Sequence, residues 1–325
     1  MPHKPIKLGL VCTAGGHFEQ MLNLSDVYSQ YDRFWITNSN TQTTSQLLNE
    51  RKYFIGQAHY KRPWTYCVQI PAVIRAFMRE RPTHVLSTGS GRTTLIPFLL
   101  AKAFRLPFLH VDTFSRVNGF SKFGSFLVRL HHAIFCQWES ANRNTVYIGP
   151  IFKASPKLQK PAEASHVFVT VGTRTESFSR LLSAVDTLVK DGSITDTVVV
   201  QAGYTRFTSP NLTIFDFCAA DRIDDLILQA RYVITQESAG IGTKCLKFNT
   251  PFIVMPRDYA HGELPTPSDM QEDLHLRLEE MGYTAVVHTV DQLREAIKKA
   301  GSIKTGFAFD NSLAIATLQK ALEES

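Results

Sequence analysis

The fold is decided by the stretch Ile6-Lys7-Leu8-Gly9-Leu10-Val11-Cys12-Thr13-Ala14-Gly15-Gly16-His17, near the start of the sequence. Its first six residues predict a short buried strand, and the small residues after them predict a tight turn into a helix. Paired glycines let the backbone approach a ligand closely, and a helix that begins there offers unpaired N–H groups and the positive end of its dipole. The stretch therefore predicts the first strand–turn–helix unit of a parallel sheet with a binding edge.

The same alternation of strand and helix patterns continues along the chain and begins again near residue 166. In the first half we expect strands at Ile6–Val11, Arg33–Thr37, His84–Thr88, Phe108–Val111 and Ala133–Cys136, and helices at about His17–Ser29, Thr65–Arg79, Thr93–Phe104 and Lys122–Leu130. In the second half we expect strands at Val167–Val171, Thr197–Gln201, Leu212–Phe215, Tyr232–Thr235 and Phe252–Met255, and helices at Glu176–Val189, Arg222–Gln229, Gly242–Phe248, Met270–Met281 and Asp291–Lys299. This pattern is typical of α/β proteins with doubly wound parallel sheets.

The length of 325 residues suits two domains of about 150 residues each. We expect a first domain at residues 1–151, a polar linker at 152–165 and a second domain at 166–325. The linker prediction rests on Pro156 and Pro161 and on the absence of an apolar period. The C-terminal helix could pack back on the first domain.

Composition and charge narrow the class of protein. Hydrophobic residues make up 44% and charged residues 20%, which is typical of folded globular chains. No signal peptide and no run of about 18 apolar residues is present, and the five scattered cysteines form no CxxC pair, so we expect a cytoplasmic protein without a zinc site or disulfides. Residues 1–152 contain 17 Lys and Arg against 7 Asp and Glu, whereas residues 153–325 contain 18 against 22. A basic first half predicts an anionic partner such as a membrane surface, and the lack of a groove-reading basic helix disfavours nucleic acid.

Three further glycine loops follow predicted strands. They are Gly89-Ser90-Gly91-Arg92-Thr93, Gly172-Thr173-Arg174 and Gln236-Glu237-Ser238-Ala239-Gly240-Ile241-Gly242-Thr243. None of them has the pattern of a dinucleotide fold or a P-loop, and Thr37-Asn38-Ser39-Asn40 after the second strand lacks the acidic residue that would hold a ribose. The segment Ser238–Thr243, which opens a helix, is the best candidate for holding a diphosphate.

Several motifs resemble those of known sugar transferases. The run Gly15–Leu22 resembles the Gly-Gly-His entry of the membrane-associated half of the two-subunit GlcNAc transferase of N-glycan assembly, and Asp112–Val117, Gln137–Glu139 and Val146–Pro150 look like its later motifs. Val167–Thr173 is similar to the opening of the partner subunit, which binds the UDP-sugar. Over about residues 6–300 the order of motifs resembles fused PssD/PssE-type (GelK-like) exopolysaccharide transferases and, more distantly, MurG. The resemblance implies a GT-B fold, in which two Rossmann-like domains face a cleft.

The resemblance also implies roles for single residues. The implied donor-binding residues are Gly172, Thr173, Arg174, Phe217, Cys218, Ser238, Ala239, Gly240, Lys244, Arg257, Glu263 and Gln271. The implied acceptor-binding residues are Gly15, Gly16, Gly89, Ser90, Gly91, Arg92 and Arg116. The chain departs from the pattern at Gln236–Gly240, where the family has His-Ala-Gly-Ala-Gly, and at Lys244, where MurG-like enzymes have a ribose-binding Glu. A cationic Lys244 or Arg257 would suit a uronic acid donor.

Sugar transfer needs a base for the acceptor hydroxyl and a field that stabilises the departing UDP. Asp112, at the end of a predicted strand, is the first choice for the base, and His17 is the second. The alternatives are that His17 bonds only to backbone and that Asp112 is a cap or turn residue paired with Arg116. No Asp-x-Asp motif is present, so we expect neither a metal nor another cofactor.

A membrane contact is suggested by Tyr60–Tyr66, which leads into a predicted helix that mixes apolar residues with arginines. The alternative is that the apolar residues face the core. Together these features predict an inverting transferase on the inner face of the cell membrane, which moves glucuronic acid, GlcNAc, glucose or galactose from a UDP-sugar to a polyprenyl-diphosphate-linked saccharide. A UDP-sugar 2-epimerase and a non-catalytic UDP-sugar-binding subunit are the alternatives.

Overall fold

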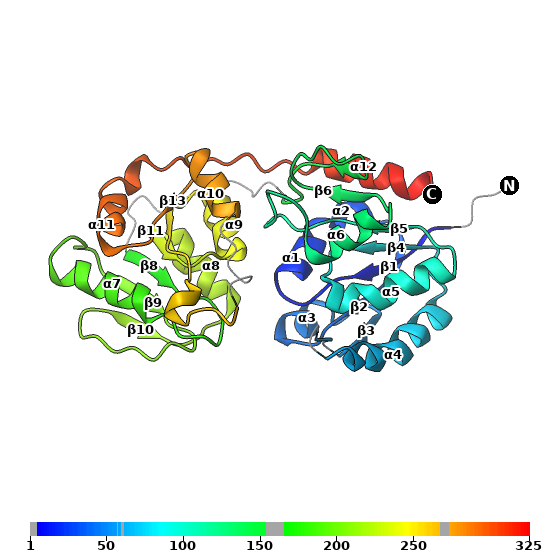
Figure 1. Ribbon diagram of the computed structural model, residues 1–325, viewed down its shortest axis with the longest axis horizontal. Helices are drawn as coiled ribbons and strands as arrows, with labels where there is room; N and C mark the ends of the chain where they lie inside the picture. Colours follow the sequence, from blue (N-terminus) through cyan, green and yellow to red (C-terminus); the bar gives the residue numbers. More distant parts are fainter. Residues whose placement is uncertain (1–4, 57, 60–61, 154–165, 267–272) are drawn as a thin grey trace. The chain divides into compact units, whose positions relative to one another are not determined.

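The chain forms two compact α/β units, which comprise Met1–Lys153 with Phe309–Ser325 and Ala154–Ala308 (Figure 1). A computed structural model describes residues 5–56, 58–59, 62–153, 166–266 and 273–325. The expected linker at 152–165 lies almost wholly outside the described residues. The C-terminal segment Phe309–Ser325 belongs to the first unit, as the sequence analysis allowed for the C-terminal helix, although the range 166–325 grouped it with the second.

The first unit is built on a five-stranded parallel sheet in the order β3-β2-β1-β4-β5. Its strands are β1 (Lys7–Val11), β2 (Asp32–Thr37), β3 (Lys52–Phe54), β4 (His84–Ser87) and β5 (Phe108–His110). A parallel pair, β6 (Ile134–Cys136) and β7 (Thr145–Tyr147), joins the end of β5 through a bridge between Val111 and Phe135. The helices are α1 (Gly16–Asn23), α2 (Ser25–Tyr28), α3 (Thr41–Gln46), α4 (Trp64–Glu80), α5 (Gly91–Ala103), α6 (Lys122–Arg129) and α12 (Ser312–Glu323).

Alternate residues of β1 face opposite layers of the first unit, as a strand period of two requires. Leu8 and Leu10 pack in one cluster with residues of α1, α2 and α12, whereas Val11 packs in a second cluster with residues of α4, α5 and α6. The helix α12 contributes Ala314 and Leu318, which are fully buried at the i, i+4 spacing of a helix face. Burial of this face explains why a distant segment belongs to the first unit.

The second unit repeats the plan with a six-stranded parallel sheet in the order β10-β9-β8-β11-β12-β13. Its strands are β8 (His166–Thr170), β9 (Val198–Gln201), β10 (Thr213–Phe215), β11 (Ala230–Thr235), β12 (Phe252–Val254) and β13 (Ala285–Val286). Its helices are α7 (Ser179–Lys190), α8 (Ala220–Gln229), α9 (Ala239–Lys247), α10 (Asp273–Glu280) and α11 (Val290–Lys298), with short 3₁₀ turns η1 (Tyr259–His261) and η3 (Ala300–Ser302). Both sheets reverse their strand order beside the first strand, which is the place where doubly wound folds bind ligands.

The expected α/β class with doubly wound parallel sheets is confirmed, and most of the expected elements are found within a few residues of their predicted bounds. The sequence pattern missed β3, β7 and β13, which are only two or three residues long and therefore show no period. It also joined α1 and α2, which the structure separates at Leu24. Within the described residues no helix is both long enough and apolar enough to span a bilayer.

Candidate functional site

In the first unit the loops that follow β1 and β4 are fastened together by hydroxyl groups. Thr13 Oγ1 lies 3.0 Å from the hydroxyl oxygens of both Ser90 and Thr93, and it accepts a hydrogen bond of 3.0 Å from the Ser90 N–H. Gly89 is required by close packing, because a Cβ there would lie 2.3 Å from Thr94 Oγ1. The loop residues are thus rigid parts of the carboxyl edge.

The edge gathers most of the residues that the resemblance assigned to the acceptor. Gly15 adopts a positive φ of 91°, and a Cβ at Gly15 or Gly16 would meet nothing within 4 Å. Gly91 is buried at the start of α5, whereas Arg92 is exposed beside it. Together with Gly89 and Ser90, these positions form one edge, of which Gly15, Gly16 and Arg92 are the parts open to a ligand.

Asp112 follows β5 and is only 4% exposed. Its Oδ2 accepts a hydrogen bond of 2.9 Å from the backbone N–H of Ser121, the N-cap of α6. Burial raises the pKa of the Asp112 carboxyl, although the bonds from Ser121 and the nearby His17 act in the opposite direction. A carboxylate with a raised pKa is a stronger proton acceptor than an ordinary Asp. No ion pair joins it to Arg116 among the described residues.

His17 lies at the start of α1, and its backbone carbonyl accepts a hydrogen bond of 2.8 Å from the Thr88 hydroxyl. Its ring Nδ1 is buried and has no hydrogen-bond partner among the described residues. Burial lowers the pKa of His17, against the opposing effects of Thr88 and Asp112. The ring is therefore neutral near pH 7 and could accept a proton.

Two buried glutamines, which we did not assign to the site from the sequence, connect its parts. Gln137 Nε2 donates hydrogen bonds of 2.9 Å to Gln20 Oε1 and to the carbonyl of Asp112. Gln20 Oε1 in turn accepts one of 3.3 Å from the N–H of Phe114. A polar amide on the apolar face of a short helix was the signal that could have identified Gln20.

Asp112 also lines a small cavity of about 10 Å³, together with Arg116, Gln137 and Glu139. This volume is close to that of one water molecule. The expected acceptor residue Arg116 thus lies beside the candidate base, although no ion pair links the two. The cavity places a charged guanidinium and a carboxylate where a hydroxyl or water could be oriented.

In the second unit three loops at the carboxyl edge pack with almost no clearance. Gly172 has a φ of 73°, and a Cβ there would lie 2.0 Å from Gln236 Nε2. A Cβ at Gly203 would lie 2.5 Å from the carbonyl oxygen of Gly172. Glycine is therefore required where the loops after β8, β9 and β11 meet.

The N-terminus of α9 is open. Ser238 caps the helix by accepting a hydrogen bond of 3.4 Å from the N–H of Ile241. The N–H groups of Ala239 and Gly240 have no acceptor within the part of the chain that the structure describes. A Cβ at Gly240 would contact only Ser238 Oγ, at 3.9 Å. This end of the helix is suited to an anion, and the expected role of Ser238–Thr243 in holding a diphosphate stays a prediction.

Three basic residues were expected at the donor, and the structure gives them different surroundings. Lys244 forms an ion pair with Asp224 of α8. Arg174 is half-buried and forms no ion pair with any described residue, yet it lies close enough to Glu237 and Arg257 to affect the pKa of both. Arg174 is therefore the best placed of the three to meet a phosphate.

Arg257 has a structural role that differs from the direct donor contact we expected. Its side chain is 1% exposed, and its guanidinium donates to the carbonyls of Glu176, Glu263 and Val171 at 2.8, 3.2 and 3.0 Å and to the side chain of Gln236. The guanidinium N–H groups are thus already bonded to acceptors inside the second unit. Arg257 acts by holding the loops that carry Gly172 and Gln236.

Glu263 is likewise bound inside the second unit. Its carboxylate accepts two hydrogen bonds from Arg180, of 3.0 and 2.8 Å, and a third from the N–H of Asp258 at 2.8 Å. Because both oxygens are engaged and the residue is 3% exposed, Glu263 supports the loop and does not face a ligand. Gln271, another expected donor residue, lies outside the described residues.

An exposed aromatic pair follows β9 and β10. Tyr204 and Phe217 are 56% and 46% exposed, and their ring centroids lie 5.0 Å apart. The expected residues Phe217 and Cys218 thus lie at the carboxyl edge, Cys218 being half-buried. Tyr204 was missed, because a lone Tyr after a strand carries no pattern. Such rings offer a face for a planar base.

Thr173 is exposed beside Gly172 in the same loop. No group of three or more His, Cys, Asp or Glu residues in the described part of the chain is arranged to hold a metal ion.

No protein-family model and no curated protein sequence matches this chain. Solved structures do match it, among them MurG from Acinetobacter baumannii (14% identity, TM-score 0.61, covering 99% of this chain and 96% of that one). UDP-N-acetylglucosamine 2-epimerase from Rickettsia bellii matches with 12% identity and a TM-score of 0.67 over 99% and 97% of the two chains. The UDP complex of S. aureus MnaA matches with 15% identity and a TM-score of 0.64 over 98% and 94%. The likeness spans both units at a sequence identity that reports only architecture, and on that basis the chain has the GT-B fold, with two Rossmann-like domains.

Proposed function

We propose that this chain is an inverting glycosyltransferase that moves a sugar from a UDP-sugar to a lipid-linked saccharide at a membrane surface. The observation that carries the proposal is the pair of carboxyl edges in one GT-B chain. The second unit offers an open helix N-terminus with Arg174 near it, and the first unit offers the buried Asp112 beside His17.

A uridine diphosphate suits the second unit on chemical grounds. Donors for phosphate oxygens are supplied by the N–H groups of Ala239 and Gly240, which have no acceptor among the described residues, and by the guanidinium of Arg174. Tyr204 and Phe217 supply an apolar face at the same edge of the sheet. The neighbour MnaA, whose structure holds UDP, supports the choice of nucleotide.

The chemical step assigned to the first unit is a proton transfer. We assign Asp112 the role of accepting the proton from the acceptor hydroxyl as that oxygen bonds to the anomeric carbon and the UDP oxygen leaves. Attack from the face opposite the leaving group inverts the configuration. The donors at α9 and the Arg174 charge would stabilise the negative charge that develops on UDP, so the proposal needs no metal.

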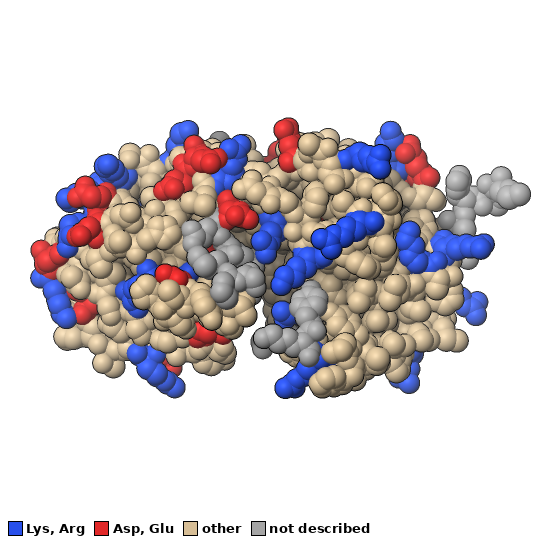
Figure 2. Space-filling model, viewed as in Figure 1, with Lys and Arg blue, Asp and Glu red and all other residues tan. Residues whose placement is uncertain are grey.

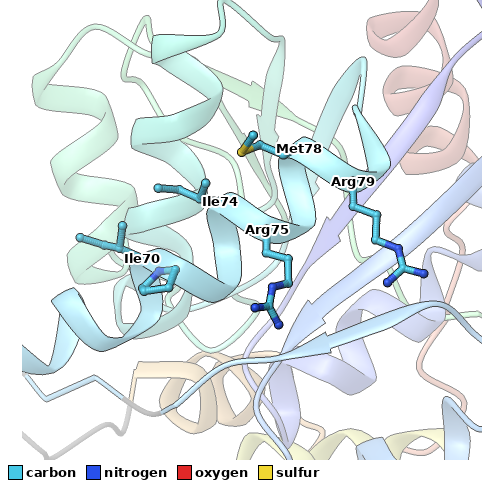
Figure 3. A pocket seen from close by; sticks show the side chains of 6 residues that line it. Ile70, Ile74, Arg75, Met78 and Arg79 are labelled. Carbon is cyan, nitrogen blue, oxygen red and sulfur yellow. The ribbon is translucent and has the colours of Figure 1, made fainter.

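The membrane part of the proposal rests on α4. Trp64, Val68 and Met78 are each more than 60% exposed, and Ile70 and Ile74 line an open groove with Met78. In Figure 3 these two isoleucines and Met78 lie along one side of the helix and Arg75 and Arg79 along another, and the two arginines also line the groove. The apolar residues expected in this helix are Ile70, Val73, Ile74, Phe77 and Met78. Val73 and Phe77 are buried and the half-buried Ile70 packs against the same cluster, whereas Met78 is exposed, so a core role does not account for the whole helix.

The distribution of charged residues also supports a membrane contact. Lys and Arg predominate on the visible face of the first unit, whereas the second unit carries both signs (Figure 2). An exposed apolar helix face flanked by arginines suits an anionic lipid surface. A cationic side chain near such a surface contributes about 1 kcal/mol, so Arg75→Gln with Arg79→Gln should lower partitioning into anionic vesicles about 30-fold.

The test measures acceptor-dependent release of UDP from UDP-glucose, UDP-galactose, UDP-GlcNAc and UDP-glucuronate. We expect one donor to be used with a polyprenyl-diphosphate-linked saccharide and none to be used without it. Trp64→Ser with Met78→Ser should reduce transfer to a vesicle-bound acceptor and spare transfer to a short-chain one. Leu313→Ser, an exposed leucine on α12 on the opposite face of the sheet, is the matched control. Equal activity of all variants on vesicles would remove the membrane from the proposal.

A UDP-GlcNAc 2-epimerase is the second candidate. The solved epimerases have TM-scores of 0.66 to 0.69 against 0.61 to 0.63 for the transferases among the matches reported, which is the observation in its favour. It predicts conversion of free UDP-GlcNAc with no acceptor present. Such turnover, seen by proton NMR of the anomeric region, would replace the transferase proposal.

A further inference from the structure

His110, the last residue of β5, is a buried histidine that the proposed reaction does not use. Its side chain is 1% exposed. Its ring Nε2 lies 3.9 Å from Asp112 Oδ1 and has no hydrogen-bond partner among the residues that the structure describes. A buried polar atom without a hydrogen-bond partner lowers the stability of the fold, so this ring nitrogen is a candidate for a role outside the core packing.

The surroundings of the ring determine its protonation. Phe108 stacks on it at 6.5 Å and Phe123 meets it edge-on at 5.1 Å. Burial, together with the nearby His17 and His132, lowers the pKa of His110 to about 3. The imidazole is therefore neutral at physiological pH and carries one N–H.

The position of that proton follows from the neighbours of the two ring nitrogens. Nδ1 lies 3.4 Å from the hydroxyl oxygen of Ser87, which itself accepts a hydrogen bond of 3.2 Å from the Gly89 N–H. The Ser87 hydroxyl donates to Thr94 Oγ1 at 3.4 Å, and Nδ1, at the same distance, is a second acceptor that its proton can reach. When the hydroxyl donates to Nδ1 instead, the proton of the imidazole lies on Nε2, which is 3.9 Å from Asp112 Oδ1.

We propose that His110 is a positioning residue for Asp112, whose Nε2–H is directed at Oδ1 and stabilises the ionised carboxylate in the orientation needed to accept a proton. Oδ2 is held from the other side by the N–H of Ser121. The hydrogen bond from Ser121 holds one carboxylate oxygen, and the Nε2–H, 3.9 Å away, acts on the other as an oriented dipole. This inference rests on the proposed function, in which Asp112 is the base.

Other titratable groups near Asp112 act differently. His17 from α1 is neutral near pH 7, and burial raises the pKa of the Cys136 thiol on β6 to about 12, so that it is neutral too. Arg116 and Glu139 line the adjacent cavity with opposite charges, and Lys122 at the start of α6 is exposed. Solvent screens the exposed groups. Among these titratable groups, His110 is therefore the one whose ring can place a neutral N–H beside the Asp112 carboxylate.

The test compares His110→Phe, which keeps the ring shape and removes the N–H, with His110→Gln, which keeps an N–H donor. The readout is the acidic limb of the pH profile of kcat/KM for UDP release. We expect His110→Phe to move the limb up by about one pH unit and His110→Gln to leave it near the wild-type position. His84→Gln, a buried histidine at the opposite end of the neighbouring strand β4, is the matched control. An unmoved limb in His110→Phe would overturn the inference.

A second measurement needs no substrate and separates this inference from the proposed function. The pH dependence of the melting temperature is compared for the wild type, His110→Phe, Asp112→Asn and the double variant. His110→Gln, with and without Asp112→Asn, is measured as the reference, because loss of an imidazole with a pKa of about 3 changes that dependence by itself. We expect His110→Phe to differ from His110→Gln when Asp112 is present and to match it in the Asp112→Asn background. Coupling in a chain that transfers no sugar would reject the proposed function alone, whereas no coupling would reject the inference. If His110→Phe does not fold, His110→Asn, whose shorter amide does not reach Oδ1, replaces it in both experiments.

Discussion

The substitution Gly172→Ala probes the edge of the second unit at its tightest point. The backbone at Gly172 has a φ of 73°, where an alanine costs about 1–2 kcal/mol. The new Cβ would also lie 2.0 Å from Gln236 Nε2, so the Gln236 side chain would have to leave its place. Because Gln236 is bonded to the buried Arg257, its displacement leaves a guanidinium donor unpaired, at a cost of about 1–3 kcal/mol. We expect a total loss of about 2–5 kcal/mol in the free energy of unfolding of this unit.

Two alanine variants in the same unit separate strain from overlap. Gly262 has a φ of 69° with nothing within 4 Å of its added Cβ, so Gly262→Ala should show the strain alone. Gly240 has neither a positive φ nor a close neighbour, so Gly240→Ala should be neutral or slightly stabilising. Urea denaturation followed by circular dichroism gives the three values, and calorimetry with UDP reports whether the loop still binds. A Gly172→Ala variant no less stable than Gly262→Ala would refute the argument from Gln236 and Arg257.

Three further predictions concern charged groups. Asp112→Asn should lower kcat about 100-fold or more, because it removes the base. It should also raise the melting temperature at pH 7, because burial disfavours the ionised carboxylate. A variant with full transfer would exclude Asp112 from the mechanism. Arg174→Ala should weaken UDP binding about 10-fold, whereas Lys244→Ala, whose ammonium is already paired with Asp224, should change it less than about 3-fold; calorimetry compares the two, and the reverse order would contradict the assignment. Burial lowers the pKa of His275 to about 4, below the unfolded value of about 6.5. Between pH 7.5 and pH 5 the unfolded chain binds a proton at this residue and the folded chain does not, so the free energy of unfolding should fall by about 2 kcal/mol. His275→Gln should show a shallower loss of stability over that interval in urea denaturation, and an unchanged slope would contradict the burial.

Much of the candidate site could be predicted from the sequence because it lies at strand ends. Gly15, Gly172 and Ser238 each follow a short apolar run, and parallel strands bring such loops to one edge. Asp112 was identified in the same way. Sequence motifs could not reveal how each side chain is occupied, and Arg257 and Glu263 consequently have supporting roles where we expected donor contacts.

The missed residues share a physical cause. Gln20, Gln137 and His110 act through partners that are between 2 and 117 positions away in the sequence, and their meaning depends on burial. A Gln or His in an apolar segment looks the same in the sequence whether its side chain is exposed or buried. Only the packing of α1, β5 and β6 against one another determines that these side chains meet.

By itself the sequence determined the class of the fold and the edge of each sheet at which chemistry would take place, because residue periods and glycine turns are local properties of the backbone. The sequence left open whether the last helix packs on the first unit, and the tertiary structure decided that it does. It also decided that Arg257 is enclosed while Arg174 is half-buried, and that the His110 ring lies beside Asp112. These outcomes depend on which surfaces are removed from water, and burial is a property of the whole folded chain.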